Sequence, residues 1–132
     1  MSRHKHTARI LAAAASLSIL GVFGAAPAMA KDGDVVVRGS CSANSTYKLK
    51  LGPRTRSIET EFEVDSNVVG QTWNVSMTDN GSTVFTGSGT TVAPSGSFTV
   101  RPRIANQAGT DMVVATATNP ATGETCVATA SV

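Results

Sequence analysis

The sequence predicts an all-β, two-sheet antiparallel sandwich of seven to eight strands, preceded by a cleaved signal peptide. Apolar and polar residues alternate with a period of two in short runs after residue 34, which is typical of half-buried strands. Turn residues separate these runs, and no run after the leader has helical periodicity. Many short strands spaced about ten residues apart favour a sandwich.

Residues 1–30 have the three parts of a secretory signal peptide. A basic start contains Arg3, Lys5 and Arg9, an apolar run covers residues 10–24, and Ala28-Met29-Ala30 fits a cleavage site. We expect export by the general secretory route, cleavage between Ala30 and Lys31, and a secreted domain of residues 31–132. The alternative is a retained N-terminal anchor helix. No second long apolar run follows, so we expect no membrane attachment after cleavage.

Removing the leader changes the charge of the chain. Three of the 11 basic residues and both histidines, His4 and His6, lie in the leader, whereas all 9 acidic residues lie after it. The mature domain therefore carries a net charge of about −1 instead of +2. This near balance of basic and acidic residues gives no reason to expect a nucleic acid as a binding partner. Without histidine, it lacks the commonest general base and the commonest metal ligand. We expect neither an enzyme nor a bound cofactor.

The first three strands are predicted at residues 35–41, 46–51 and 58–65, with residues 52–56 as a turn. The second and third strands each alternate apolar and charged residues, so matching their apolar faces sets their register. The predicted pairs are Leu51 with Ile58, Tyr47 with Phe62, Lys50 with Glu59, and Lys48 with Glu61. Opposite charges across the pair would add a few tenths of a kcal/mol each, and a slip of one residue would bury them.

A fourth strand is predicted at residues 72–78, with Trp73, Val75 and Met77 on one face. Asn80-Gly81 follows it and indicates a type I′ hairpin turn, which needs positive φ at both residues. A two-residue turn sets Met77 opposite Val84 and sends Phe85 to the other face. We expect a second layer to cover Phe85 there, and the alternative is an exposed aromatic side chain. Residues 87–96 are rich in Gly, Ser, Thr and Pro and are expected to form a connection.

The next strand is predicted at residues 97–104, with Phe98, Val100 and Ile104 inward. Pro102 interrupts the run, and proline cannot donate to a strand ladder. This strand is therefore either at a sheet edge or ends at Val100. A proline at an edge blocks edge-to-edge pairing, which favours a monomer.

The last hairpin is predicted at residues 112–119 and 125–132, joined by Pro120-Ala121-Thr122-Gly123. Its inward face carries small side chains, which let the facing sheet approach closely: Ala115, Ala117, Ala128 and Ala130. Two cysteines in a short exported chain are expected to pair, Cys41 with Cys126. The alternative is a reactive free thiol.

The mature chain resembles an immunoglobulin-like sandwich, and in particular the small exported actinobacterial proteins of that type that have no assigned activity. Five segments carry the resemblance: Gly39-Ser40-Cys41-Ser42, Glu61-Phe62-Glu63-Val64-Asp65, Gly70-Gln71-Thr72-Trp73, Asp79-Asn80-Gly81 and Asn119-Pro120-Ala121-Thr122-Gly123-Glu124-Thr125-Cys126. It implies the fold and export but no functional residue. Its cysteines depart from antibody domains, in which the bridge joins the centres of the two sheets and Trp follows the first Cys closely.

Three groups of charged residues raise chemical alternatives. Glu59, Glu61, Glu63 and Asp65 line one strand face at about 6.5–7 Å, near the spacing of acid/base pairs, but a solvated face balanced by Lys and Arg explains them better. Asp32-Gly33-Asp34 and Asp79-Asn80-Gly81 resemble fragments of calcium loops, which need more oxygen ligands. The loop arginines could inhibit a protease, although most such side chains are simply solvated: Arg54, Arg56, Arg101 and Arg103.

We expect a secreted, non-enzymatic binding module whose partner is a protein or a cell-envelope ligand. Its contact surface would be a loop end or the Thr-rich outer face of the last hairpin: Thr116, Thr118, Thr125, Val127 and Thr129. The alternative is a carrier of a small hydrophobic molecule, which a cleft lined by Trp73, Phe85 or Phe98 would favour. An enzyme would need a perturbed carboxylate in a concave site.

Overall fold

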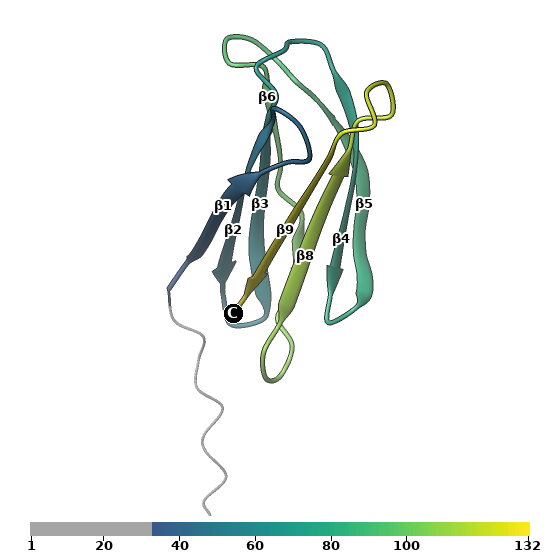
Figure 1. The fold of residues 1–132 in the computed structure, drawn as a ribbon. Coiled ribbons are helices and arrows are strands. Elements are labelled where there is room, and N and C mark those ends of the chain that lie inside the picture. Colours follow the sequence, from purple (N-terminus) through teal and green to yellow (C-terminus); the bar gives the residue numbers. More distant parts are fainter. Residues whose placement is uncertain (1–32) are drawn as a thin grey trace, which may run out of the picture.

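The computed structural model describes residues 33–132; the leader and its predicted cleavage site lie outside the described residues. The described chain consists of nine strands in two antiparallel sheets, as Figure 1 shows. No helix in this part of the chain could span a membrane. The predicted all-β, two-sheet architecture is confirmed.

One sheet, sheet A, contains β1 (Val35–Ser40), β2 (Thr46–Pro53), β3 (Ser57–Asp65), β6 (Ser97–Val100) and β7 (Arg103–Ala105). Its order is β1-β2-β3-β6, and β7 also pairs with β3. Sheet B contains β4 (Thr72–Asp79), β5 (Ser82–Thr90), β8 (Met112–Thr118) and β9 (Thr125–Ser131), in the order β5-β4-β8-β9. Nine strands exceed the seven to eight predicted because Pro102 divides the run 97–104 into β6 and β7. The expectation that the strand ends at Val100 is confirmed.

The predicted pairing of β2 with β3 is confirmed, but its register is wrong by two residues. Leu51 lies opposite Thr60 instead of Ile58, and Tyr47 opposite Val64 instead of Phe62. Likewise, Lys50 and Lys48 lie opposite Glu61 and Glu63 instead of Glu59 and Glu61. The cause is that β2 continues through Gly52 and Pro53, which leaves a shorter turn. A two-residue shift keeps every side chain on its predicted face.

The Asn80-Gly81 turn is confirmed, with φ of 48° and 85°. Beyond it, a bulge follows the Thr78–Thr83 pair, so Met77 lies opposite Phe85 instead of Val84. An extra residue in one strand reverses the faces of the residues that follow it. Phe85 therefore shares the inner face of Met77 and packs against the core, whereas Val84 is exposed.

β5 runs to Thr90, so the expected connection at residues 87–96 begins four residues later than predicted. Glycines 87 and 89 lie opposite Val75 and Trp73. A Cβ on Gly89 would overlap the ring of Phe98, and one on Gly87 would come within 2.7 Å of the Phe85 ring. Aromatic rings thus cover the two glycines, and the strand needs glycine there for that reason.

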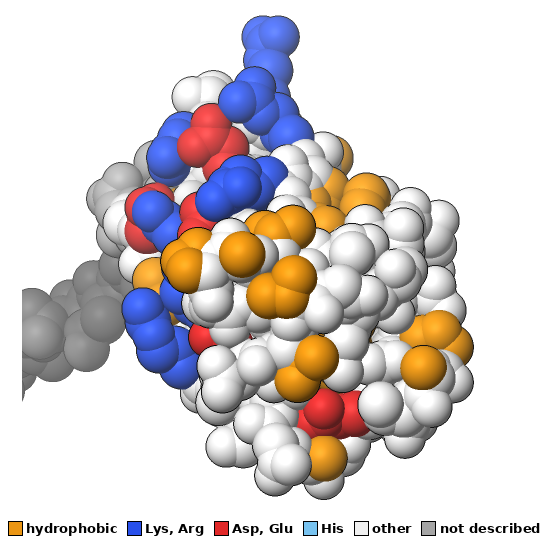
Figure 2. Space-filling view, turned by 90° about the horizontal axis from the view of Figure 1, so that it is seen from above, with side chains coloured by type: hydrophobic (Ala, Val, Ile, Leu, Met, Phe, Trp, Pro, Cys, Tyr) orange, Lys and Arg blue, Asp and Glu red, His pale blue; other side chains and the backbone are white. Residues whose placement is uncertain are grey.

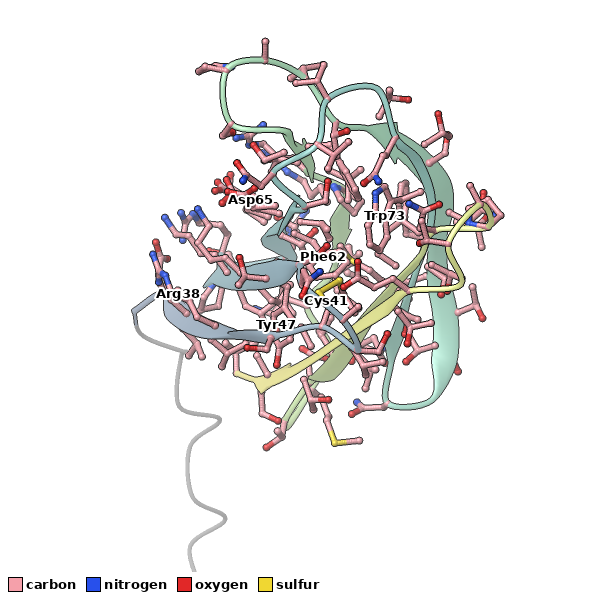
Figure 3. The ribbon with its side chains drawn as sticks, turned by 45° about the horizontal axis from the view of Figure 1, so that its top comes forward. Arg38, Cys41, Tyr47, Phe62, Asp65 and Trp73 are labelled. Carbon is pink, nitrogen blue, oxygen red and sulfur yellow. A yellow bond between two sulfur atoms is a disulfide. The ribbon has the colours of Figure 1, made fainter. Side chains whose placement is uncertain are left out.

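The core lies between the sheets, and Trp73 and Phe62 are its largest fully buried side chains. Figure 3 shows both pointing into the space between the sheets, whereas Arg38 and Asp65 point away from it. The four alanines predicted to face inward are all buried. The predicted disulfide is confirmed: it joins Cys41, just after β1, to Cys126 in β9 and links sheet A to sheet B.

Candidate functional site

The two outer faces of the sandwich differ sharply in charge. The strands of sheet B contain a single charged residue, Asp79, and it is buried. The charged side chains on sheet A and its turns include Lys48, Lys50, Glu59 and Glu61. Seen from the loop end in Figure 2, charged side chains gather on one side of the molecule. The outer face of sheet B, which we call the hydroxyl face, is therefore uncharged.

Strand register arranges the hydroxyl face in rows across the four strands. The rows are Ser88, Asn74, Thr118 and Thr125; then Thr86, Ser76, Thr116 and Val127; then Thr83, Thr78, Val114 and Thr129. Apart from Asn74 and two valines, every member is Ser or Thr. Thr72 and Thr90 continue the pattern at one end, where their hydroxyls lie 3.0 Å apart.

The surface predicted on the last hairpin is part of this face. Val127 and Thr129 are exposed, and Thr116, Thr118 and Thr125 are half-buried. No further layer covers them in residues 33–132. Three exposed apolar side chains, Val84, Met112 and Val127, also lie on the strands of sheet B.

The opposite, charged face contains the predicted row of carboxylates, and its cations neutralise them. Lys48 Nζ lies 2.9 Å from Glu61, and Lys50 Nζ lies 3.0 Å from Asp34. The hydrogen bond from Lys48 lowers the pKa of Glu61, and that from Lys50 lowers the pKa of Asp34. A general acid needs a raised pKa, whereas the pKa of each of these two carboxylates is lowered. Both therefore act as ion-pair partners of the lysines.

The loop end of the molecule presents a second exposed apolar group: Val68, Val69 and Val92. The loops that carry these valines are bonded to each other, because Gly70 N donates to Thr91 O and Ser66 N donates to Gly96 O. The Thr91 hydroxyl also donates to the carbonyl of Val68 at 2.5 Å. These valines therefore sit on loops that support each other, and Val68 lines a hollow together with Thr122 and Gly123 of the β8–β9 turn.

The three aromatic residues considered for a cleft pack into the core instead. Trp73 is fully buried, Phe98 nearly so, and their ring centres lie 6.4 Å apart. Phe85 packs against the same core. Two hollows on the described surface have other linings, one on the charged face and one beside Glu124.

The structure describes Gly33 and Asp34 of the first calcium-like fragment and all of the second. The described residues contain no group of three or more acidic, cysteine or histidine side chains that could hold a metal ion. Asp34 instead pairs with Lys50 and Arg54, and Asp79 is buried. Asp32 lies outside the described residues.

The segregation of charge is the feature that sequence reasoning missed. A signal was available: residues 66–100 contain one charged residue, Asp79, and residues 104–132 contain two, Asp111 and Glu124. What the sequence could not indicate is that β4 and β5 of the first segment form one sheet with β8 and β9 of the second, whereas β6 and β7 join the charged sheet. Searches against family models, curated proteins and solved structures gave no match for this chain.

Proposed function

We propose that this chain is an exported, monomeric, non-enzymatic binding module with an immunoglobulin-like fold, and that it docks a protein partner on the hydroxyl face. In this proposal, the order β5-β4-β8-β9 would correspond to strands C′-C-F-G of immunoglobulin-type domains, and β2-β3-β6 to A-B-E. Trp73 then occupies the strand C position at which such domains bury a tryptophan. β1 is an added edge strand, and the disulfide differs from the usual one.

The observation that carries the proposal is the absence of charge on the outer face of four adjacent strands. The centres of protein interfaces are depleted of charged residues, because an unpaired charge is costly to bury. Removing water from a hydroxyl group costs less free energy than removing it from a charged group, and a hydroxyl can hydrogen-bond to a partner's backbone. The exposed Met112 and Val127 add apolar area on β8 and β9. Outward positions on these strands hold no aromatic ring on which a sugar could stack, so a protein fits better than a glycan.

The test is site-specific cross-linking of the oxidised domain, residues 31–132, in the culture medium of its native host. A photo-cross-linking residue replaces Thr116, at the centre of the face, and in a matched control replaces Glu63 on the charged face. We expect one protein adduct from position 116 that excess unmodified domain suppresses. Equal adducts from both positions, or none from position 116, would contradict the proposal.

A charge substitution then tests the same face without a cross-linker. Thr116→Lys puts a cation among uncharged residues and should weaken capture of the cross-linked partner about tenfold or more. Thr99→Lys on β6 of the charged sheet is the control and should leave capture unchanged. Both variants should unfold at the temperature of the parent domain. If Thr116→Lys captures the partner as well as the parent domain does, the contact surface lies elsewhere.

The packing of Trp73, Phe85 and Phe98 gives the carrier hypothesis no support, because their rings fill the space in which a ligand would lie. Native mass spectrometry of the secreted domain separates the two functions directly. We expect the bare mass of residues 31–132 less two hydrogens for the disulfide. A reproducible added mass of a small apolar molecule would favour the carrier.

A further inference from the structure

The charged face contains a hollow of about 270 Å³ beside the break between β6 and β7. Four cations line it, from β2, the β2–β3 turn and the two ends of that break: Lys50, Arg54, Arg101 and Arg103. Only two carboxylates, Glu59 and Glu61, line the same hollow. Its lining therefore has an excess of two positive charges, although the whole mature domain is close to neutral.

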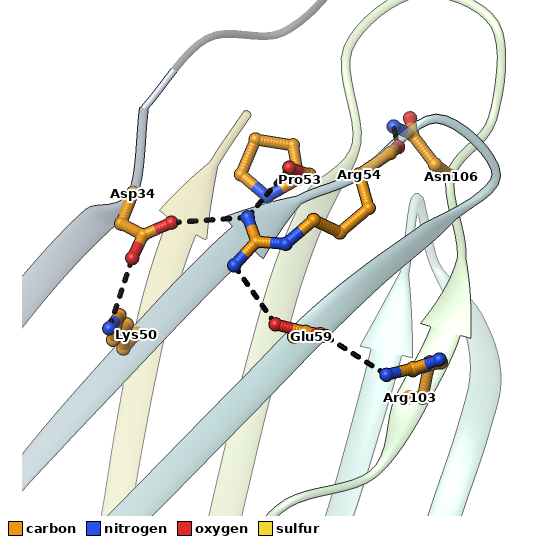
Figure 4. A network of polar contacts seen from close by, with 7 residues as sticks. All are labelled: Asp34, Lys50, Pro53, Arg54, Glu59, Arg103 and Asn106. Atoms are coloured by element: carbon orange, nitrogen blue, oxygen red, sulfur yellow. Dashed lines mark hydrogen bonds and ion pairs between the residues drawn. The ribbon is translucent and has the colours of Figure 1, made fainter.

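The carboxylates are shared between cations, as Figure 4 shows for part of the network. Glu59 bonds to both Arg54 and Arg103, each at 2.9 Å. Glu61 in turn pairs with Lys48 at 2.9 Å and with Arg101 at 3.5 Å. Asp34, behind the hollow, is divided between Lys50 and Arg54. Each carboxylate thus serves two cations, and the cations remain only partly neutralised.

The two arginines next to Pro102 are held by single contacts and remain open to solvent. The side chains of Arg101 and Arg103 are 64% and 68% exposed. Arg103 uses one terminal nitrogen on Glu59, and Arg101 uses its Nε on Glu61. A guanidinium has five N–H donors, so most donors of both arginines are free for a further acceptor.

The backbone fixes both arginines on one side of β3. Pro102 interrupts the edge strand, and its carbonyl accepts hydrogen bonds from the amide and the hydroxyl of Thr60. Gly52 keeps the opposite wall open: a Cβ there would lie 3.0 Å from Asp34 Oδ1 and 3.3 Å from the Arg54 guanidinium. The backbone on both sides of the hollow is therefore fixed by the Thr60–Pro102 bonds and by the glycine at position 52.

We infer that this hollow is a binding site for a phosphate-bearing anion, either a phosphate dianion or the phosphodiester of a larger molecule. A tetrahedral oxyanion can accept hydrogen bonds from several directions, which suits the arginine forks of Arg101, just after β6, and Arg103 in β7, and a lysine from β2. Its negative charge would neutralise the positive charge in the hollow that Glu59 and Glu61 leave uncompensated. This site lies on the face opposite the hydroxyl face and does not rest on the function proposed for that face.

The experiment titrates inorganic pyrophosphate into the isotope-labelled, oxidised domain at pH 7 and about 20 mM salt, where screening is weak. We expect amide shifts confined to Gly52, Glu59–Glu61, Arg101 and Arg103, and affinity that falls as salt is raised. Shifts spread evenly over all basic residues, or no shift at millimolar pyrophosphate, would overturn the inference.

Matched variants assign the effect to the hollow. Replacing both edge arginines, Arg101→Gln and Arg103→Gln, removes two charged donor groups and should weaken binding about tenfold or more. Arg56→Gln removes the same charge from the same β2–β3 turn as Arg54 but outside the hollow, and should change affinity less than about twofold. An equal loss of affinity in Arg56→Gln would show that pyrophosphate is attracted to basic residues in general, and it would overturn the proposed site.

Two further arms identify the source of the phosphate. Co-sedimentation with vesicles of neutral and anionic phospholipid tests a lipid headgroup, and binding to linear polyphosphate tests a free polymer. If the double arginine variant loses either interaction, the site is supported, and the probe concerned identifies the source of the phosphate group. Binding to both probes that the double variant retains would place the phosphate contacts elsewhere and overturn the assignment.

Discussion

At the scale of single residues, Glu124 is the side chain that fixes the disulfide loop. Its carboxylate accepts hydrogen bonds from Ala43 N at 3.0 Å, from Ser45 N at 2.9 Å and from the Ser45 hydroxyl at 2.7 Å. These residues are far from Glu124 in sequence, so the contact joins the β1–β2 loop to the β8–β9 turn. No pattern in the sequence indicates it, because Glu124 stands alone among turn residues.

Glu124→Gln should destabilise the domain by about 1 kcal/mol at pH 7, because an amide cannot accept all three hydrogen bonds. Burial acts to raise the pKa of Glu124, but the hydrogen bonds from Ser45 and Ala43 prevail and lower it. A lowered folded-state pKa contributes stability above the unfolded-state value of about 4.3, and this contribution disappears as pH falls through the folded-state value. Urea unfolding at pH 7 and at pH 2.5 should therefore show the difference from wild type only at pH 7.

Glu63→Gln is the matched control, because its carboxylate lies 3.9 Å from Lys48 and accepts only a long hydrogen bond from Thr99. Its effect should stay below about 0.5 kcal/mol. A Glu124→Gln difference that persists at pH 2.5 would mean that shape, and not charge, accounts for the role of Glu124.

Gly89→Ala should cost about 1–3 kcal/mol, the usual range for overpacking. The new methyl group would meet the Phe98 ring, which is itself buried in the core. Ser88→Ala, one residue earlier on the exposed face, should stay within about 0.5 kcal/mol of wild type. Equal urea midpoints for the two variants would show that the Phe98 ring moves freely.

At the scale of elements, the hairpin β8–β9, the strand β4 and the break at Pro102 could be predicted, because local alternation and turn residues determine them. The register of β2 with β3 could not. Local sequence favours a turn at Pro53, but β1 starts at Val35 opposite Leu51. No strand of sheet A therefore needs an N–H from Pro53, and β2 can continue. The length of β5 depends on Phe98, a residue of the other sheet, so local composition could not indicate it.

Asn80 determines how the β4–β5 turn attaches to the rest of the molecule. Its side-chain amide donates to Thr110 O at 3.0 Å, and its oxygen accepts from Met112 N at 2.9 Å. Asn80→Gly keeps the positive φ and loses these bonds, whereas Asn80→Ala loses both features. We expect costs of about 1 kcal/mol for Gly and about 2 kcal/mol for Ala. The opposite order in thermal unfolding would mean that backbone conformation is unimportant here.

At the scale of the whole molecule, the disulfide supplies much of the stability, because its loop spans 85 residues. The chain-entropy model gives about 4–5 kcal/mol for a loop of this length. Reduction should lower the free energy of unfolding by nearly that amount, and the double variant Cys41→Ser, Cys126→Ser should match the reduced protein in urea. A change below about 1 kcal/mol would mean that packing alone holds the sheets together.

The candidate site also belongs to this scale. Each strand of sheet B could be assigned its polar face from the sequence, and the outward set on the last hairpin was predicted correctly. The continuous face exists only because β4 pairs with both β5 and β8. Partner strands far apart in the sequence are chosen by packing and not by local pattern, so neither the rows of hydroxyl groups nor the cationic hollow could be predicted.

The bond between Cys41 and Cys126 also determines what a protease could do to this protein. Every strand from β2 to β8 lies on the covalent ring that the bond closes, and β1 and the part of β9 after Cys126 lie outside it. A single cut in any loop of that ring, for example at the exposed residues 67–70 or 107–110, produces two fragments that stay joined. The cut protein would keep its intact mobility on a non-reducing gel and separate into two bands only after reduction.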